Sequence, residues 1–427
     1  MARKSTRHFL FLHEILFMAL NIVWIAFFVI AFVVAVIKFF FFHDTEIFKT
    51  LTDGLFDSAT SSVINVAFPL AGTMVFFLGL MNIAEKAGAI RWLSRLLNPF
   101  LKRLFPEVPD NHPAMGEMVM NFSANMLGLD NAATPFGLKA MSSLQELNPN
   151  KETASNSQIM FLVLHTSGLT LIPLSILSYR LAGGSHDVAS VFIPCVLGTL
   201  CTTIAGIICI SFWQKLKWDA VLVSWLLTIV AIIGGMLFWI NKLTPEQKDV
   251  FSKAAGSFIL LLLVIVIISV AAYKKVPVFD AFIDGAKGGF DVVLKIIPYL
   301  VGMLVAIRVF RDCGALGYIT DGIGYVIKSI GLNTDFVPSL PVALMKPFSG
   351  SGARGLMIDT MKAYGPDSFV GKLSCTFHGS ADSTFYIVAL YFGSVGIKRV
   401  RYAIWAGMLA DILGAIAVIL IAYIFYK

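Results

Sequence analysis

Charged side chains are scarce in this chain of 427 residues: Asp, Glu, Lys and Arg make up 14% of it, whereas hydrophobic residues make up 57%. The mean hydropathy is +0.81. Because a soluble domain usually carries about 25% charged residues, this composition excludes a soluble protein and indicates a polytopic membrane protein. The net charge of +7 comes from short Lys and Arg clusters beside apolar runs. Such clusters set membrane topology and form no single basic face, so we expect no nucleic-acid partner.

Cysteine is also scarce, with five residues in the whole chain. They form no CxxC pair, have no interleaved histidines and lie mostly inside apolar segments, at Cys195, Cys201, Cys209, Cys313 and Cys375. We interpret them as small buried hydrophobes, so neither a disulfide framework nor a metal site is expected.

Motifs of the common catalytic sites are missing from the sequence. It contains no GxSxG, no HExxH and no Walker loop, and no segment is suited to a soluble nucleotide-binding domain. We therefore expect a protein that is not an enzyme and has no cofactor. The enzymatic alternative is an intramembrane transferase that uses His378 and Asp382, which predicts a head-group-sized pocket open to lipid.

Two stretches are too apolar for a loop and too polar for a plain membrane span. In the first, 115–141 (MGEMVMNFSANMLGLDNAATPFGLKAM), Gly128, Pro135 and Gly137 interrupt the helical pattern, which predicts two half-helices that meet at a broken tip. The second is 345–362 (MKPFSGSGARGLMIDTMK). In hydrocarbon, broken backbone is tolerated only where protein or a water-filled cavity satisfies its polar groups. Two such segments in corresponding places indicate a transporter's binding site, so we expect two re-entrant helical hairpins.

Apolar runs predict about nine transmembrane helices of roughly 20 residues each. The first follows Arg3, Lys4 and Arg7 and lacks a small-residue cleavage site, which predicts an uncleaved helix with its N-terminus in the cytoplasm. Amphipathic segments are predicted at 46–62, 86–103 and 315–331. The predicted crossings are 15–42, 63–81, 157–181, 188–212, 220–240, 255–273, 292–310, 368–393 and a last one that ends at Phe425.

The two halves of the chain repeat each other in order. Five crossings separate equivalent elements, and an odd number inverts the second half relative to the first. We therefore predict an all-α fold with inverted-topology repeats at 56–217 and 276–427, preceded by a basic segment and first transmembrane helix at 1–55 and joined by transmembrane helices at 218–275. The matching segments are AGAI and CGAL at Ala87 and Cys313, FSAN and FSGS at Phe122 and Phe348, and HTS and HGS at His165 and His378.

Two longer segments resemble known signatures. NFSANMLGLDNAATPFGLKAM at 121–141 resembles spore maturation protein A, and GARGLMIDTMKAYGPDSFVGKLSCTFHGSADSTFYIVALYFGSVGIKRVRY at 352–402 resembles spore maturation protein B. From about residue 56 to its end, the chain is thus similar to a fusion of these two proteins, which carry the nucleoside-recognition or Gate domain. The resemblance implies a multi-pass protein of the bacterial cytoplasmic (inner) membrane. Gate domains are also similar to the cores of concentrative nucleoside transporters, which implies a solute.

At the first tip, neutral side chains can bind a polar solute without the cost of burying charge. Alternatively, they satisfy the broken backbone. Asp130 is an intramembrane carboxylate, which either needs a cation, a proton or a base as partner or caps the second half-helix. The neutral candidates are Asn121, Ser123, Asn125, Asn131 and Thr134.

At the second tip, Ser349 and Ser351 alternate with glycines that let backbone amides converge, and Lys346 and Arg354 flank them. A turn of this kind with a guanidinium nearby forms an anion site for a carboxylate or phosphate. The alternative for Arg354 is a pair with Asp359 or contact with lipid head groups.

His165 and His378 occupy equivalent positions in the two repeats. Asp382 follows His378 by four residues and lies on the same face if that segment is helical. Because histidine titrates near neutral pH, proton handling or solute binding is expected at these positions, with packing as the alternative. Hydroxyl groups accompany them at Ser167, Ser380 and Thr384.

The expected function is secondary transport of a small polar solute, anionic or nucleoside-like, by alternating access near the bilayer midplane. Phe377, Phe385 and Tyr386 are candidates to stack on a ring. Oxygen-rich tips suit Na⁺ as the coupling ion, whereas paired histidines suit H⁺. By similarity to transporter cores, a homo-oligomer is expected. The alternative is a membrane assembly factor in envelope or spore maturation that does not transport, with tips that pack dry.

Overall fold

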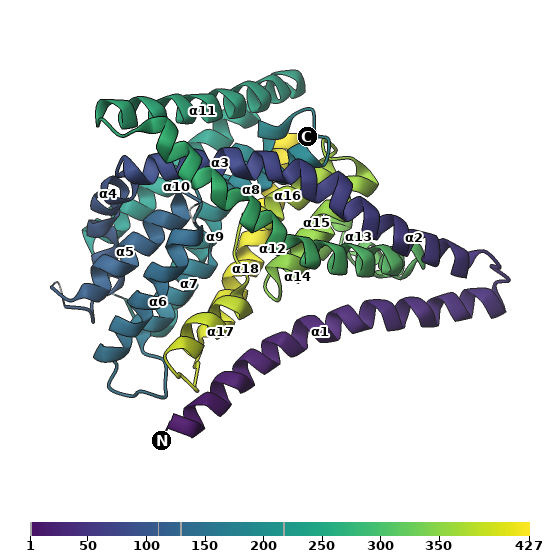
Figure 1. Cartoon of the computed structure of the whole chain (residues 1–427), viewed down its shortest axis with the longest axis horizontal. Coiled ribbons are helices and arrows are strands. Elements are labelled where there is room, and N and C mark those ends of the chain that lie inside the picture. Colours follow the sequence, from purple (N-terminus) through teal and green to yellow (C-terminus); the bar gives the residue numbers. More distant parts are fainter. Residues whose placement is uncertain (1, 110, 129, 217) are drawn as a thin grey trace.

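Figure 1 shows the computed structural model, which describes residues 2–109, 111–128, 130–216 and 218–427; the side chains at 2–20, 130–132, 245, 246, 248, 249, 252 and 253 are outside the description. Within this part of the chain every regular element is a helix, as predicted. In order they are α1 (Ala2–Phe41), α2 (Ile47–Ser61), η1 (Ser62–Ala67), α3 (Phe68–Lys86), α4 (Ala89–Leu104), α5 (Pro113–Met126), α6 (Asp130–Leu147), α7 (Asn156–Thr166), α8 (Leu174–Ala182), η2 (Val188–Val191), α9 (Phe192–Gln214), α10 (Ala220–Asn241), α11 (Pro245–Tyr273), α12 (Val278–Asp312), α13 (Ala315–Ser329), η3 (Val337–Ser339), α14 (Leu340–Met345), α15 (Gly350–Tyr364), α16 (Phe369–Gly379), α17 (Thr384–Ser394) and α18 (Ala403–Tyr426).

Seven helices in the described residues are long and apolar enough to cross a membrane, so the chain is a polytopic membrane protein. They are formed by α1, the run from α2 to α3, the run from η2 to α9, α10, the apolar part of α11, α12 and α18. The other two predicted crossings, 157–181 and 368–393, correspond to the interrupted pairs α7–α8 and α16–α17. Breaks explain why these two pairs contain no single long apolar helix.

The predicted amphipathic segment 46–62 and the predicted crossing 63–81 form one helical run, Ile47–Lys86, with a π-helical turn at Ser62–Ala67. The predicted boundary between these two segments coincides with the start of this turn, and the helix continues through it. This run packs along α12 with the backbones in close contact, and α3 and α12 cross in Figure 1. A Cβ added at Gly289 would lie 2.7 Å from the Cα of Val75, and one at Gly285 would lie 2.6 Å from the carbonyl oxygen of Leu78. Small residues at this crossing permit the van der Waals packing that associates helices in lipid.

Helices of the two halves pair in opposite directions. Along α9 and α18, Gly198 contacts Val418 and Gly206 contacts Ala410, so residue numbers rise on one helix as they fall on the other. The helix α8 is also antiparallel to α16, because Ile176 lies against Gly379 whereas Arg180 contacts Cys375. The helix α7 is antiparallel to α17, because the end of α7 bonds to Asp382, just before α17, whereas Phe161 packs on Tyr391. Of these pairs, α9 and α18 are equivalent helices, since each follows the break of its half, and their antiparallel pairing is the arrangement that an inverted repeat predicts.

The two interrupted pairs cross at their breaks. The backbone N–H of Asp382, in the break after α16, donates to the carbonyl oxygen of Thr166, at the end of α7, over 2.8 Å. Gly168 has a φ of +61°, and a Cβ there would lie 3.0 Å from the backbone of Asp382. Glycine is therefore required at this crossing, because any side chain meets the opposite break.

Two helical hairpins flank the breaks. The first is α5–α6, broken at Leu127 and Gly128, where Gly128 has a φ of +71°. Pro135 and Gly137 were also expected to interrupt the helix, but both lie inside α6. The second hairpin is α14–α15, with its turn at 346–349. Its first arm precedes the predicted stretch, and the re-entrant placement of both hairpins stays a prediction.

Candidate functional site

A cavity of about 380 Å³ lies where the hairpins and the breaks meet. The crossing of α3 and α12 forms another wall, with Asn82 and Glu85 from α3. Glu85 is exposed, so the cavity opens beside the C-terminal end of α3. The polar residues and tight turns around it come from Asn125, Gly128, Gly168 and Thr170 in the first half and from Lys346, Gly350, Arg354, His378 and Asp382 in the second.

The first hairpin ties its amides into a buried network behind the cavity. Asn121 donates to the carbonyl oxygen of Ala133 over 2.7 Å, which joins the two arms of the hairpin. The Oδ1 atom of Asn121 lies 3.1 Å from Nδ1 of His165, and the Nδ2 atom of Asn125 lies 3.2 Å from the same nitrogen. The ring of Tyr391 packs edge-on against His165. Asn125 lines the cavity, whereas Asn121 and His165 support it from behind.

Two other predicted residues of the first half, Ser123 and Ser167, hydrogen-bond within and between helices. Ser123 faces α4, where its hydroxyl lies 3.0 Å from that of Ser94. Ser167 donates to the carbonyl oxygen of Leu164 and lies 3.0 Å from the hydroxyl of Thr203. Thr134 is half-buried in α6 and is not part of the cavity wall. The side chains of Asp130 and Asn131 lie outside the described residues.

The second tip presents cations to the cavity. Lys346 is only 7% exposed, and its Nζ lies 3.4 Å from Nδ1 of His378. Arg354 places its guanidinium 5.3 Å from the ring centre of Tyr179, on α8. Ser349 is not part of the cavity wall, and its hydroxyl accepts the N–H of Gly352 over 3.0 Å and caps α15. Ser351 lies 3.1 Å from the Ser349 hydroxyl and also remains within the tip.

Arg354 keeps part of its hydrogen-bonding capacity. Its Nε atom is enclosed and meets no acceptor among the described residues. The alternative pair with Asp359 does not form, because Arg311 of α12 binds that carboxylate through Nε over 2.7 Å. A buried guanidinium nitrogen without a partner is costly unless a ligand supplies the acceptor.

His378 and Asp382 were predicted to share a helical face if the segment between them is helical, but the second break lies between them. The helix α16 ends at Gly379, so these residues do not share a helical face, although both line the cavity. Ser380 donates back to the carbonyl oxygen of Phe377 over 3.0 Å and closes the helix end. Thr384 donates to Asp411 of α18 over 2.7 Å, away from the cavity wall.

The aromatic residues expected to stack on a ring do not line the cavity. Phe377 is buried in the core, Phe385 stacks on Phe348 at 5.1 Å, and Tyr386 is exposed. The aromatic side chains that do line it include Phe77 and Tyr179. No sequence motif pointed to Tyr179, whose place follows from the way the first break folds back on the second tip.

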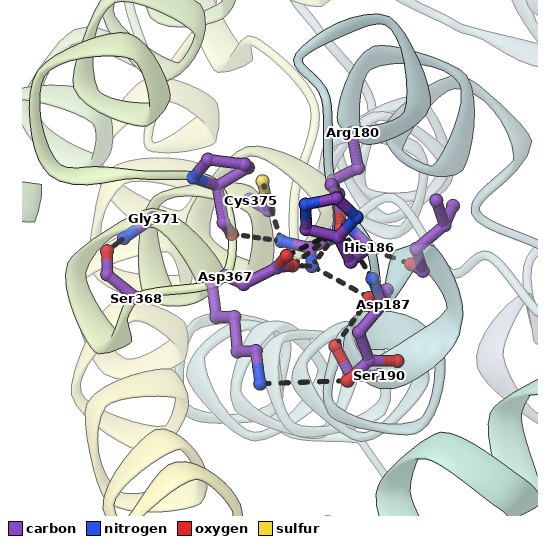
Figure 2. Close-up of polar contacts among 12 residues, drawn as sticks. Arg180, His186, Asp187, Ser190, Asp367, Ser368, Gly371 and Cys375 are labelled. Carbon is purple, nitrogen blue, oxygen red and sulfur yellow. Dashed lines mark hydrogen bonds and ion pairs between the residues drawn. The ribbon is translucent and has the colours of Figure 1, made fainter.

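A polar cluster that the sequence did not indicate joins the two halves at the C-terminal end of α8 (Figure 2). Arg180 is fully buried. It donates through Nη1 to the carbonyl oxygen of Pro366 over 2.6 Å, through Nη2 to Asp367 over 2.7 Å and through Nε to the carbonyl oxygen of Val188 over 3.3 Å. All three guanidinium nitrogens thus have acceptors. We name Arg180, Ser185 and Asp367 the clamp.

The clamp also shifts the acidity of Asp367. Burial raises the pKa of this carboxyl, but hydrogen bonds from the Ser185 hydroxyl and the His186 backbone, with the charge of Arg180, outweigh burial and lower the pKa below its ordinary value. A lowered folded-state pKa contributes stability above the unfolded-state pKa, and this contribution is lost as the pH falls through the folded-state pKa.

This fold and cavity define a class: polytopic membrane proteins whose two halves each bring a hairpin and a broken helix to one central cavity. A family model described as Gate, nucleoside recognition, matches residues 67–181 and 293–398, more than half of the chain. The chain therefore belongs to the Gate (nucleoside recognition) family. Both matched segments include a hairpin and a break.

Two relatives each match a little less than half of the chain. Spore maturation protein A of Bacillus subtilis (strain 168) is 39% identical over 188 residues, 44% of this chain and 92% of that protein. Spore maturation protein B of the same organism is 43% identical over 170 residues, 39% of this chain and 94% of that protein. The predicted family resemblance is thus confirmed. No solved structure matches the chain.

Proposed function

We propose that this protein is a secondary transporter, not an enzyme, which moves a small polar solute across the bacterial cytoplasmic membrane by alternating access. One observation carries the proposal: a single cavity is lined by both hairpins and both breaks. Broken helices in membranes direct half-helix ends and unwound backbone at a solute. Because the cavity lies between two halves whose helices pair antiparallel, these halves can rock against each other around it.

The basic residues favour a cytoplasmic N-terminus for this topology. With α1 crossing outward, the end of α3 at Lys86 and the loop that carries Lys398 and Arg401 lie on the cytoplasmic side. Exposed Glu85 borders the cavity at this same end, so on this topology we infer an inward-facing state. The hairpin α5–α6 then enters from the cytoplasm, and α14–α15 enters from outside.

Charge at the second tip favours a solute with an anionic group. Lys346 and Arg354 bring positive charge to the cavity, and neutral groups, Asn125 and Thr170, come from the first half. A carboxylate or phosphate would bind the cations while a polar body meets the amide and hydroxyl. A nucleoside is the second candidate, favoured by the description of the family as nucleoside recognition. It does not need the two cations.

The alternatives are less well supported. A membrane assembly factor without transport requires dry tips, whereas a 380 Å³ cavity with polar walls separates them. An intramembrane transferase requires a pocket that opens to lipid, whereas the exposed acidic Glu85 at the cavity edge favours an aqueous opening.

The solute class can be tested by thermal unfolding of the purified protein. We expect stabilisation by inorganic phosphate, phosphorylated compounds or organic acids, because a ligand at about a hundred times its Kd adds roughly 2.7 kcal/mol to the free energy of unfolding. Nucleosides form the neutral arm of the screen. Failure of every compound to shift the melting temperature would remove the support for a solute.

The variant Arg354→Ala tests whether the second tip is the anion-binding site. It should abolish the shift caused by an anion and spare any shift caused by a neutral compound, because only the anion uses the guanidinium. Arg91→Ala, on the exposed face of α4, is the matched control for loss of a positive charge. If Arg354→Ala retains the full anionic shift, the second tip is not the anion site.

A further inference from the structure

Asp411 lies in the middle of α18, which is described over its whole length and contains no other acidic or basic residue. This helix is also one of the candidate membrane spans. A carboxylate within a span is costly, and such residues in transporters usually take part in ion or proton pathways. The cavity wall does not include Asp411, so solute binding leaves its presence unexplained.

The two carboxylate oxygens of Asp411 differ in their surroundings. Oδ2 accepts the hydroxyl of Thr384 over 2.7 Å. Oδ1 is enclosed, and the described residues provide no hydrogen-bond donor for it. Gly407, one turn earlier on α18, permits this geometry, because a Cβ there would lie 2.6 Å from the methyl group of Thr384. The fold therefore brings Thr384 close to α18. It leaves one enclosed carboxylate oxygen without a donor among the described residues, so this oxygen can bind a small cation.

Thr384 connects Asp411 to the cavity. It is the first residue of α17 and follows the second break directly. Two residues earlier, Asp382 lines the cavity and bonds through its N–H to the opposite break. Between them, the hydroxyl of Ser383 is enclosed and faces Gly350 at the second tip, without a hydrogen-bond partner in the described part of the chain. A change of charge at Asp411 thus acts on the break that forms the cavity wall.

The groups around Asp411 favour a proton over a metal ion. Lys346 of the second tip and Asp382 of the break act on it electrostatically. Among the helices packed against α18, α7 and α16 carry His165, His378 and Lys372, whereas α9, α10 and α17 carry no acidic or basic side chain. The acidic and basic residues of α11, which also packs against α18, lie within 246–253, and their side chains are outside the description. Hard cations such as Ca²⁺ and Mg²⁺ take about six or more oxygen ligands. Among the described residues, one hydroxyl contacts this carboxylate, which suits a proton.

We propose that Asp411 is the proton-binding residue through which a proton gradient drives the transporter. A proton from the aqueous cavity forms an O–H bond at Oδ1 and leaves as H⁺ when the site opens to the other side. Protonation removes the negative charge from the acceptor of the Thr384 hydroxyl, and hydrogen bonds to ionised acceptors are about twice as strong as neutral ones. Binding of the proton therefore loosens the second break. This inference rests on the transport function proposed above.

The test follows the infrared carbonyl band of protonated carboxyl groups in the purified full-length protein while the pH is raised. In the unmodified protein we expect a band that disappears as Asp411 loses its proton. Asp411→Asn should lack this band, and Asp335→Asn, in an exposed loop, should retain it. An identical band in Asp411→Asn overturns the proposal.

A second variant covers the case in which Asp411→Asn does not fold. Thr384→Val keeps the carboxyl but removes the hydroxyl that stabilises its charge, so the band should persist to higher pH. An unchanged titration contradicts the proposed coupling between Asp411 and the break. Since no solute is present, a negative result leaves the transport proposal standing, and a failed solute screen leaves proton binding untouched.

Discussion

Arg180 and Arg354 lie at the same helix, α8, but differ in how completely their guanidinium groups are hydrogen-bonded. Arg180 belongs to the clamp, where its three guanidinium nitrogens donate to oxygens of both halves. Arg354 lies beside Tyr179, the neighbour of Arg180 in sequence, and its Nε finds no acceptor among the described residues. A fully paired buried charge holds the fold, whereas a partly paired one at a cavity marks a place for a ligand.

The same contrast separates the two hairpins. Asn121 and Asn125 of the first hairpin share a network with His165, which leaves a preformed neutral surface. Around the second hairpin, several enclosed polar atoms have no hydrogen-bond partner within the described ranges: Arg354 Nε, Ser383 Oγ and Asp411 Oδ1. We infer that the first hairpin supports the site, that the second hairpin binds the solute and that Asp411 of α18 provides the coupling through the second break.

The largest effect is expected from Arg180→Ala. It removes a fully buried guanidinium from half-buried Asp367 and from the carbonyl oxygens of Pro366 and Val188, and should lower the free energy of unfolding by about 3–5 kcal/mol, as measured by thermal unfolding of the purified protein. Lys398→Ala, which removes an ion pair with the exposed Glu152, is the control and should cost at most about 1 kcal/mol. Equal losses from both variants would show that the clamp does not hold the halves together.

A smaller loss is expected from Asn121→Ala. The change removes the donor to the Ala133 carbonyl and the partner of His165, so the free energy of unfolding should fall by about 1–3 kcal/mol. The exposed Asn65→Ala provides a control, with an effect within about 0.5 kcal/mol. A neutral Asn121→Ala would contradict a supporting role for the first hairpin.

The smallest effect is expected from Tyr179→Phe. The hydroxyl of Tyr179 is enclosed and has no hydrogen-bond partner in the part of the chain that the structure describes. Its removal should leave the free energy of unfolding within about 0.5 kcal/mol, because no bond is lost and the ring still packs against Arg354. Chemical or thermal unfolding measures this. A loss above about 1 kcal/mol would mean that the hydroxyl has a partner and that Tyr179 belongs with the clamp.

Local patterns predicted the class, the breaks and the two tips. Apolar runs predicted nine crossings, seven of which correspond to long apolar helices in the described residues, and glycines such as Gly128 and Gly168 lie at positions of positive φ. Lys346, Arg354, His378 and Asp382 line the cavity together, as their places at the second tip and break suggested. These features depend on residues close in sequence, which is why they could be predicted.

The remaining features depend on partners far apart in sequence. Arg180 and Asp367 are separated by 187 positions, and nothing in the local sequence of either indicates the other. The serines Ser349 and Ser380 were predicted to bind solute, but a helix terminus uses each of them. A hydroxyl beside a helix end often hydrogen-bonds to a backbone group and is then not available to a ligand. The sequence alone does not show in which direction the hydroxyl points.

The helical run Ile47–Lys86 has a consequence for the bilayer around the protein. At 1.5 Å per residue, its 40 residues extend about 60 Å, twice the roughly 30 Å thickness of the hydrocarbon core. Even a tilt of about 40°, the upper end of the usual range, leaves part of the run outside the hydrocarbon. Its first turns carry Thr50, Asp53 and Asp57, which suit the head-group layer. Lipids beside this helix must therefore accommodate a helix longer than the hydrocarbon core. We expect the packing of α3 against α12 to depend on membrane thickness.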